Sequence, residues 1–255
     1  MTNKSDNILV TRLTLGEINS RCTMEEHSKK LFVKNDTGNI EIGVVYFRAG
    51  YTPDDYKTQN DWEARLLLER SYAIKCPNIS THIAGSKKVQ QVLADPEQLK
   101  RFVWSDIIFN AISKTFADMY PMDDSPHGLK GREIALHKPN HYVLKPQREG
   151  GGNNIYREEI PKFLKSIPES HWPSYILMEL IEPPERSGTI LRDGQTKSGA
   201  TMSELGVFGC HIWNTENGDV VESSVPGYLV RTKFRESNEG GVATGWACLD
   251  SLHFS

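Results

Sequence analysis

The sequence predicts a mixed α/β fold of the α+β kind, with helices mainly in the first half of the chain and strands mainly in the second. Helix-start signals and helical spacing of apolar residues dominate up to about residue 120. β-Branched and aromatic runs dominate after about residue 140, and Asn217-Gly218 between two of them is a strong hairpin signal. A length of 255 residues with 38% hydrophobic and 25% charged side chains indicates a folded, soluble chain.

Charge and hydropathy exclude several classes of protein. The chain has 30 basic and 33 acidic side chains and a net charge of -3, without long basic runs, so it lacks the charge pattern of a nucleic-acid-binding protein. Its apolar runs are far shorter than the roughly 20 residues that cross a bilayer. The N-terminal residues contain no apolar core of signal-peptide length, and the 4 cysteines form no C-x-x-C pair. We therefore expect a cytoplasmic protein with reduced thiols and neither nucleic-acid nor membrane partners.

The first helix is expected to begin at Thr14, because Thr14 and Glu17 have the spacing of a capping box. The β-branched and aromatic run 40–47 then predicts a buried strand. It ends in Arg48-Ala49-Gly50-Tyr51, a cation and a phenol after the carboxyl end of a strand, which is where open α/β sheets bind ligands. A plain loop with a solvated arginine explains this segment equally well.

A second helix is expected from Asn60, which forms a plausible cap with Glu63. Arg65 is expected on its charged, solvent-facing side. The apolar residues recur on the other side and are expected to form core: Trp62, Leu66, Leu67, Ala73 and Ile74.

Helices are expected to continue to about Tyr120. Residues 87–93 form a short one, followed by Asp95-Pro96, where Asp can cap and Pro can open the next helix. The helix or pair of helices after it carries apolar residues that are expected to pack: Phe102, Val103, Ile107, Ile108, Ile112, Phe116 and Met119. The polar, turn-rich segment 122–139 suggests a connection into a second structural unit.

Strands are expected through most of the remaining chain. The candidate segments are 142–145, 175–181, 205–213, 220–223 and 228–233. Arg231 and Lys233 are two residues apart in the last of them, so both side chains are expected on one face and could enter one pocket.

The most informative stretch of the sequence runs from Leu144 to Tyr156. Pro146 keeps Lys145 extended, so the lysine ammonium is expected to project from a strand end. The three glycines 150–152 then allow backbone N–H groups to converge on an anion such as a polyphosphate. The alternative is a flexible linker, although linkers seldom lie between such a strand end and an Asn-Asn pair that opens an expected helix.

Other residues narrow the chemistry of this stretch. Glu149 and Asn154 add hard oxygen ligands of the kind that suits Mg²⁺. The glycine spacing matches neither a P-loop nor a dinucleotide-binding motif, and the sequence contains neither Gly-x-Ser-x-Gly nor His-Glu-x-x-His. His137 and His141 are four residues apart, but Pro139 between them argues against the helix that would make them converge, so no zinc site is expected.

Four motifs occur together: 45–51 (Val-Tyr-Phe-Arg-Ala-Gly-Tyr), 62–71 (Trp-Glu-Ala-Arg-Leu-Leu-Leu-Glu-Arg-Ser), 145–154 (Lys-Pro-Gln-Arg-Glu-Gly-Gly-Gly-Asn-Asn) and 240–243 (Gly-Gly-Val-Ala). With these motifs the chain resembles the eukaryotic glutathione synthetases, which are ATP-grasp ligases. The resemblance extends from about Val10 to the C-terminus. It implies an ATP-grasp-like fold with a glycine-rich lid. It also implies that glycine is ligated to γ-glutamylcysteine through an acyl phosphate, with ATP converted to ADP and glutathione as the product.

The resemblance implies roles for individual residues, with Lys145 and Arg231 catalytic and Glu149 a ligand of Mg²⁺. The residues implied in ATP binding are Lys87, Lys145, Pro146, Gln147, Arg148, Glu149, Gly150, Gly151, Gly152, Asn153, Asn154, Tyr156, Met178, Glu179, Leu180, Ile181, Glu204, Lys233 and Glu239. Those implied in binding the peptide are Arg48, Ala49, Gly50, Tyr51, Arg231, Val242 and Ala243. The arginines suit this role, because the peptide's free carboxylates are best matched by a guanidinium fork.

The resemblance also implies how the chain is divided. Residues 1–86 would be a partial substrate-binding domain, and residues 87–255 an ATP-grasp ATP-binding domain with its lid at about 140–203. Mg²⁺ would be the cofactor and ATP the co-substrate, and the family is homodimeric. Family members are about twice as long, with further Mg²⁺ and peptide ligands in their N-terminal half, so this chain is expected to be a C-terminal portion. A nucleotide- or thiol-peptide-binding module without turnover, and a dimerisation partner for a full-length subunit, are the alternatives.

Overall fold

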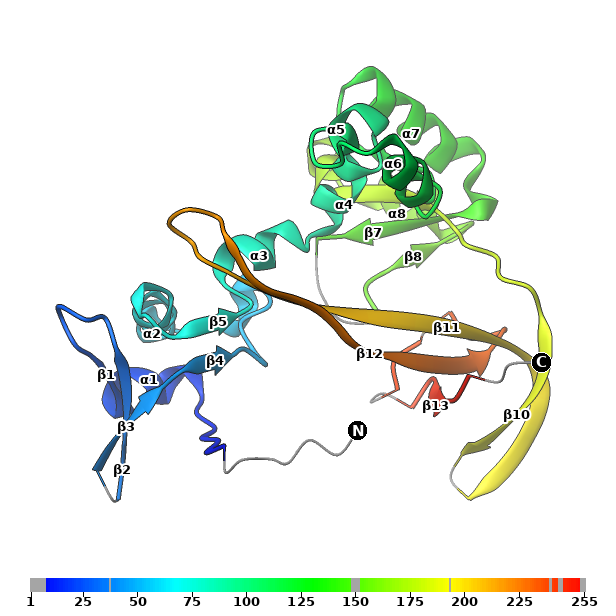
Figure 1. Ribbon diagram of the computed structural model, residues 1–255. Helices are drawn as coiled ribbons and strands as arrows, with labels where there is room; N and C mark the ends of the chain where they lie inside the picture. The colour runs from blue at the N-terminus through cyan, green and yellow to red at the C-terminus, as the bar shows by residue number, and fades with distance from the viewer. Residues whose placement is uncertain are drawn as a thin grey trace.

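The computed structural model of the chain describes residues 8–36, 38–147, 152–192, 194–238, 240–242 and 245–252. The described residues form a 3-stranded sheet, a 2-stranded sheet and two 4-stranded sheets, joined by short helices (Figure 1). The mixed α+β class predicted from the sequence is therefore confirmed. No helix in these ranges is both long and apolar enough to cross a bilayer.

The N-terminal part combines two small sheets with helices. Its elements are α1 (Leu15–Arg21), β1 (Cys22–Met24), β2 (Leu31–Asn35), β3 (Gly38–Ile42), β4 (Val44–Tyr46), the 3-10 helix η1 (Pro53–Asp55), α2 (Gln59–Arg70), β5 (Ile74–Cys76) and α3 (Ile79–Ala84). Strands β1, β2 and β3 pair antiparallel in that order. Leu31 and Val33 of β2 form a core with Ala64 and Leu68 of α2. The predicted capping box at Thr14 is confirmed.

Helix α2 differs from its prediction in both its cap and its buried face. Thr58 caps the helix with Asp61, so the cap predicted at Asn60 is wrong. The buried face carries Asp61, Ala64, Arg65 and Leu68, whereas Trp62 of the predicted core side is 46% exposed. Apolar periodicity misplaced the face because Ala64 lets the helix approach the core closely and Arg65 is paired within the protein.

The predicted buried strand 40–47 is two strands, separated at Gly43, and neither strand contains a buried residue. Strand β4 pairs parallel with β5, and these two strands are the whole of their sheet in the described chain. Val44 is 58% exposed and Tyr46 is 64% exposed. Parallel strands are ordinarily covered on both faces, so this pair presents an unusually apolar surface.

The middle of the chain forms a sheet of order β6-β9-β7-β8. Its elements are α4 (Lys87–Leu93), α5 (Pro96–Lys100), α6 (Asp106–Ser113), β6 (Met119–Pro121), α7 (Pro126–His137), η2 (Pro139–His141), β7 (Tyr142–Pro146), β8 (Ile155–Tyr156), α8 (Glu159–Ser166), η3 (Glu169–Ser174) and β9 (Tyr175–Glu179). Leu144 and Leu177 belong to a core with Ile160 and Leu164 of α8. Val143 and Met178, opposite each other on the neighbouring strands, belong to a separate apolar cluster.

Helix 87–93 has the predicted bounds. The predicted helix or pair of helices after it is the pair α5 and α6, but the pair ends at Ser113 and not near Tyr120. Of the predicted packing residues, Met119 is buried, whereas Phe102, between the two helices, and Ile107 of α6 are exposed. The predicted connection 122–139 contains helix α7. Its glycines allow close contact rather than a turn, because a Cβ at Gly131 would lie 2.6 Å from Tyr120 Cβ.

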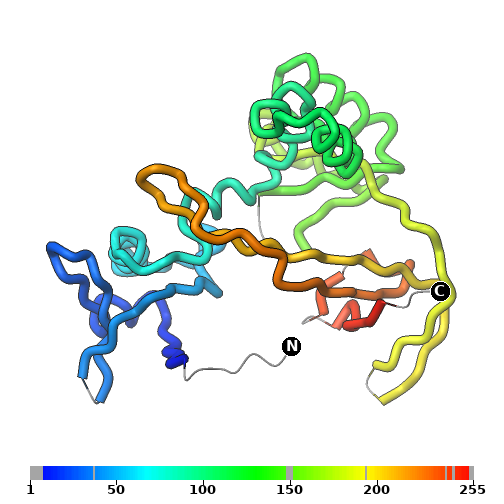
Figure 2. The backbone as a smooth tube through the Cα atoms, viewed as in Figure 1, coloured from blue at the N-terminus to red at the C-terminus, as the bar shows by residue number. Residues whose placement is uncertain are grey.

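The C-terminal part is an antiparallel sheet built on a long hairpin (Figure 2). Its strands are β10 (Arg186–Arg192), β11 (Gln195–Trp213), β12 (Val220–Phe234) and β13 (Cys248–Asp250). The hairpin predicted at Asn217-Gly218 is confirmed, with Gly218 at a φ of 78° in the turn. Strand β12 joins two segments that were predicted as separate strands.

Candidate functional site

Lys145 lies at the end of β7, where the described chain brings it close to two other charged residues. Burial lowers the pKa of Lys145, the ammonium of Lys87 lowers it further, and the carboxylate of Glu204 acts in the opposite direction. These residues come from β7, from the first position of α4 and from β11. Three residues predicted to bind ATP thus share one electrostatic environment.

Hydrogen bonds fix the two elements that carry the lysines. The backbone N–H of Lys88 donates to Oε1 of Gln147 at 2.8 Å, which joins the start of α4 to the end of β7. Lys88 also forms an ion pair with Asp123, at 3.5 Å. Ser86 caps α4 by accepting from the N–H of Val89. The predicted ATP-binding residue Gln147 therefore helps to place Lys87.

Strand β8 connects this region to the end of β12. Nδ2 of Asn154 donates to the hydroxyl of Tyr156 at 3.3 Å, and that hydroxyl donates to the carbonyl of Asn238 at 3.3 Å. Nζ of Lys233 donates to the carbonyl of Ser237 at 2.6 Å. The expected helix start at Asn154 is wrong, because a short strand follows it and α8 begins later. The segment after the glycines is nevertheless held beside Lys233 and its loop.

Strands β11 and β12 place charged residues on one face. Glu204 is directly opposite Arg231 in the register, and Met202 is opposite Lys233, so both cations lie on the same face as predicted. Arg231 forms an ion pair with Glu204. The guanidinium has five N–H donors, so it can hold this carboxylate and still have donors for a ligand carboxylate.

The predicted adenine-facing strand provides an apolar wall. Met178 is buried, and Tyr156 and Leu180 pack against its cluster. The N–H of Glu179 donates to the carbonyl of Asp118, and that of Leu180 to the carbonyl of His141, each at 2.8 Å. Ile181 at the end of the segment is 69% exposed. The apolar wall therefore ends at Leu180, before the exposed Ile181.

The turn after β4 lies on a groove that also reaches the lysine region. Gly50 is buried and has a φ of 80°, whereas Arg48 and Ala49 before it are exposed. The N–H of Tyr51 donates to Oδ2 of Asp55 at 2.8 Å. The groove has a volume of about 290 Å³, and its lining includes Gly50, Tyr51, Tyr56, Trp62, Lys87 and Gln147. The predicted peptide-binding turn and two predicted ATP-binding residues thus share one groove.

Several predicted site residues lie outside the described part of the chain: Arg148, Glu149, Gly150, Gly151, Glu239 and Ala243. Four other predicted site residues, close to these in the sequence, are described. Pro146 ends β7, Gly152 has a φ of 84°, and Asn153 precedes β8. The carbonyl of Val242 accepts a hydrogen bond from the N–H of Gly245.

The described residues offer a divalent metal few ligands. They contain no group of three or more His, Cys, Asp or Glu that could hold a metal ion. In the candidate site, Glu204 and Glu179 carry carboxylates, and Asn154 and Gln147 carry amide oxygens. A set of this size fits Mg²⁺ held largely by substrate phosphates and water, which is how proteins usually bind that ion.

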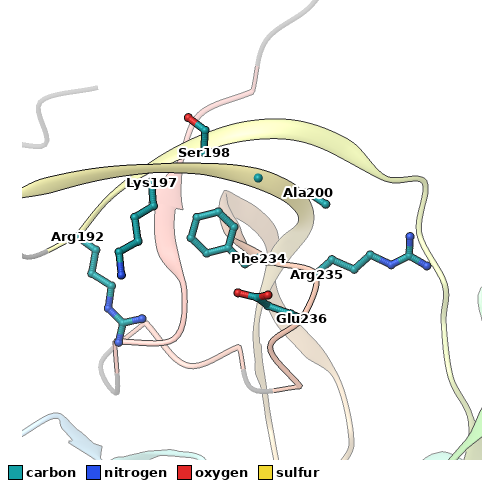
Figure 3. A pocket seen from close by; sticks show the side chains of 8 residues that line it. Arg192, Lys197, Ser198, Ala200, Phe234, Arg235 and Glu236 are labelled. Atoms are coloured by element: carbon teal, nitrogen blue, oxygen red, sulfur yellow. The ribbon is translucent and has the colours of Figure 1, made fainter.

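A larger cavity, of about 620 Å³, lies elsewhere, between β10, β11 and the end of β12. Arg192, Lys197 and Phe234 face into it, whereas Ser198 and Arg235 point away (Figure 3). None of the predicted site residues lines this cavity. It is therefore separate from the candidate site.

Comparison with known proteins places the chain. The family model described as eukaryotic glutathione synthase, ATP binding domain, matches residues 6–254. The chain belongs to this family. It is 45% identical over 248 residues to the glutathione synthetase large chain of Schizosaccharomyces pombe, covering 97% of this chain and 49% of that relative. It is 44% identical over 248 residues to glutathione synthetase of Homo sapiens, covering 96% of this chain and 51% of that relative.

A solved structure confirms the fold. The apo form of a glutathione synthetase-like effector from Globodera pallida matches with a TM-score of 0.66 and 23% identity, over 97% of this chain and 49% of that one. The predicted ATP-grasp-like, α+β class of the family is thereby confirmed. The chain spans about half the length of the curated relatives it matches.

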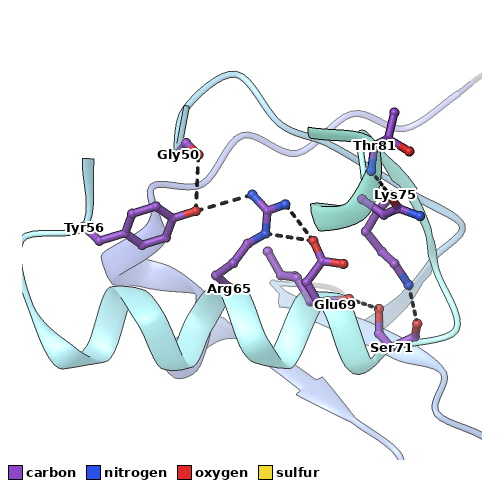
Figure 4. A network of polar contacts seen from close by, with 9 residues as sticks. Gly50, Tyr56, Arg65, Glu69, Ser71, Lys75 and Thr81 are labelled. Carbon is purple, nitrogen blue, oxygen red and sulfur yellow. Dashed lines mark hydrogen bonds and ion pairs between the residues drawn. The ribbon is translucent and has the colours of Figure 1, made fainter. Parts of the chain in front are cut away.

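The site residues that the sequence did not indicate mostly hold other residues in place. Asn238 accepts from Tyr156 across 82 residues of chain, and no local pattern marks it. The family motif 62–71 includes Arg65 and could have indicated it. Because its side chain is charged, Arg65 was instead expected on the solvent-facing side of the helix. In the structure it is buried in a network of polar contacts beside the groove (Figure 4).

Proposed function

We propose that this chain is the ATP-binding part of a glutathione synthetase. In the proposed reaction, a carboxylate oxygen of γ-glutamylcysteine attacks the γ-phosphorus of ATP, and ADP leaves. The amine of glycine then attacks the acyl phosphate carbon, phosphate leaves and the amine loses a proton, which gives glutathione. The convergence of Lys145, Lys87 and Glu204 beside the groove with Gly50 and Tyr51 is the observation that carries this proposal.

The two lysines would neutralise and align the phosphates. Phosphoryl transfer between oxygens requires mainly alignment and charge neutralisation from the protein. Lys145 suits this role because burial has removed water from its ammonium. A bound phosphate would take the place of that water and stabilise the charged form of the side chain. Lys233 would complete the set from β12. Mg²⁺, held by Glu149 and the phosphates, would supply further charge neutralisation when bound.

The adenine base and the peptide would bind to the other surfaces described above. Adenine would lie against the apolar residues of 178–181, including Met178 and Leu180. The peptide would be held by the turn 48–51, by Arg231 and by residues 242–243. The ion pair of Arg231 with Glu204 would orient the guanidinium toward a peptide carboxylate. Glycines 150–152 would cover the acyl phosphate and exclude water from it.

The quaternary state and location are also proposals. We infer a homodimer, as the family resemblance implies, and a location in the cytoplasm, as expected from the cysteine pattern of the sequence. Because the chain spans about half of its relatives, a binding module without turnover is the second candidate.

Complementation tests the proposal. The chain would be mixed with a separately expressed polypeptide corresponding to the half of the human relative that it does not span, together with ATP, Mg²⁺, γ-glutamylcysteine and glycine. Glutathione is expected from the mixture and not from the mixture containing Lys145→Met. Binding of ATP without any glutathione from the mixture would favour the binding module instead. Absence of ATP binding to the chain would contradict the proposed function, and absence of both ATP and γ-glutamylcysteine binding would contradict both candidates.

A further inference from the structure

Arg65 of α2 is buried although its charge predicts a solvent-facing position. Its side chain is 6% exposed, and its ion-pair partner Glu69 is 17% exposed. Nη2 of Arg65 lies 2.6 Å from Oε1 of Glu69, and Nε donates to the same oxygen at 2.8 Å. The guanidinium carbon lies 3.8 Å from the centre of the Phe47 ring. Buried arginines are rare without such partners, and this one is held on two sides.

A third contact links Arg65 to the turn beside the groove. Nη1 of Arg65 donates to the hydroxyl of Tyr56 at 3.3 Å, and this hydroxyl donates to the carbonyl of Gly50 at 3.4 Å (Figure 4). The Tyr56 ring also stacks on the Trp62 ring, with centres 4.0 Å apart and planes 15° apart. Helix α2 therefore holds Tyr56 by its hydroxyl and by its ring.

Gly50 packs directly against Tyr56, which leaves no space for a side chain at this position. A Cβ at Gly50 would lie 2.6 Å from the Tyr56 hydroxyl oxygen and 3.6 Å from Nη1 of Arg65. The φ of 80° is also one that glycine adopts readily and other residues rarely do. The turn can approach Tyr56 this closely because glycine occupies the position.

The network thus holds both ends of the exposed dipeptide Arg48-Ala49. Phe47 before the dipeptide lies against the guanidinium of Arg65, and Gly50 after it is bonded to Tyr56. Both Phe47 and Gly50 are buried, whereas Arg48 and Ala49 are exposed. The backbone on either side of Arg48 is therefore held by a residue that lies outside the turn, while the Arg48 guanidinium itself lies 5.9 Å from the centre of the Tyr46 ring.

We propose that Arg65 is a positioning residue that fixes the turn 48–51 for its ligand, acting through Tyr56 and Phe47. Arg65 does not itself face the groove. The inference rests on the proposed function insofar as that ligand is the γ-glutamyl peptide.

Tyr56→Phe tests the proposal with little disturbance, because it removes the hydroxyl between Arg65 and Gly50 and keeps the ring that stacks on Trp62. Loss of these hydrogen bonds is expected to weaken binding of γ-glutamylcysteine about two- to tenfold and to speed amide hydrogen exchange at Tyr51 by a similar factor. ATP affinity is expected to stay at its wild-type value, and the midpoint of thermal unfolding is expected to fall slightly, because the Gly50 carbonyl and Nη1 of Arg65 each lose a partner. The exposed Tyr72→Phe is the matched control.

Arg65→Lys provides a second, independent test. Lysine can keep the ion pair with Glu69, but its single nitrogen cannot reproduce the fork that also reaches Tyr56. The same selective loss of peptide affinity and of exchange protection at Tyr51 is expected, in the complemented enzyme as a higher KM for the peptide with kcat nearly unchanged.

The outcomes separate this proposal from the proposed function. Unchanged exchange at Tyr51 in both variants would overturn the positioning role. A loss of ATP affinity as large as the loss of peptide affinity would also overturn it, because Arg65 would then be a general structural residue. If the wild-type chain, alone and complemented, binds no γ-glutamylcysteine, the peptide assignment fails, and the exchange measurement still decides whether Arg65 fixes the turn.

Discussion

Replacing Lys145 by methionine is expected to stabilise the nucleotide-free chain while it weakens nucleotide binding. Burial and the ammonium of Lys87 lower the pKa of Lys145 from its ordinary value of 10.5, so folding disfavours the protonated form. Between the folded and the ordinary pKa the unfolded chain binds more protons, and stability therefore rises with pH across that interval. Below the folded pKa the full destabilisation is present. Methionine removes it and has a similar shape, so the unfolding midpoint at neutral pH is expected to rise.

The loss of nucleotide affinity follows from the contact that Lys145 would make. A hydrogen bond to a charged group contributes about 1.5–3 kcal/mol, which corresponds to a 10- to 150-fold weaker Kd for ATP. Calorimetric titration with ATP, ADP and adenosine measures it. Adenosine has no phosphate, so its affinity is expected to be unchanged by the substitution.

Lys162→Met is the matched control for Lys145→Met. Lys162 is 69% exposed and pairs with Glu159 on the surface of α8. It is expected to change neither ATP affinity nor the unfolding midpoint by a measurable amount. Unchanged ATP affinity in Lys145→Met would contradict a contact between Lys145 and the phosphates, and so would an equal loss of adenosine affinity, which would show general damage to the site.

Three further predictions concern turnover and stability. The chain alone is expected to form little or no glutathione from γ-glutamylcysteine, glycine and Mg·ATP, and ordinary turnover in a coupled ADP assay would contradict this. Gly131→Ala is expected to destabilise the chain by about 1–3 kcal/mol, because its Cβ would overlap Tyr120, whereas Gly227→Ala has open space; equal unfolding midpoints would be the contrary result. The Ser125 hydroxyl lowers the pKa of Asp123 from its ordinary value of 3.8. The ionised Asp123 therefore stabilises the folded chain fully above pH 3.8, and this stabilisation is lost as pH falls through the pKa of Asp123 in the folded state. Asp123→Asn is therefore expected to flatten the acid limb of a stability–pH profile, and an unaltered limb would argue against this.

Local chemistry explains what could be predicted of the fold. The capping box at Thr14 and the bounds of α4 depend on neighbouring residues, and both were correct. The burial of Arg65 and the helical role of Gly131 depend on contacts with Glu69 and Tyr120, which residue patterns do not reveal.

The candidate site divides in the same way. The family motifs indicated Lys145 and the turn 48–51, and the structure places both near Lys87. The bond from Lys88 to Gln147 joins residues 59 positions apart, and the carbonyl of Asn238 has no side-chain signature. Such contacts follow from the packing of the strands and could not be read from residue types.

A crystal structure of the chain with Mg²⁺ and a non-hydrolysable ATP analogue would locate the nucleotide. Phosphate oxygens are expected within hydrogen-bonding distance of Lys145 and Lys87, with the base against Met178 and Leu180. A nucleotide seated instead in the cavity of Arg192 and Lys197, with Lys145 untouched, would contradict this expectation.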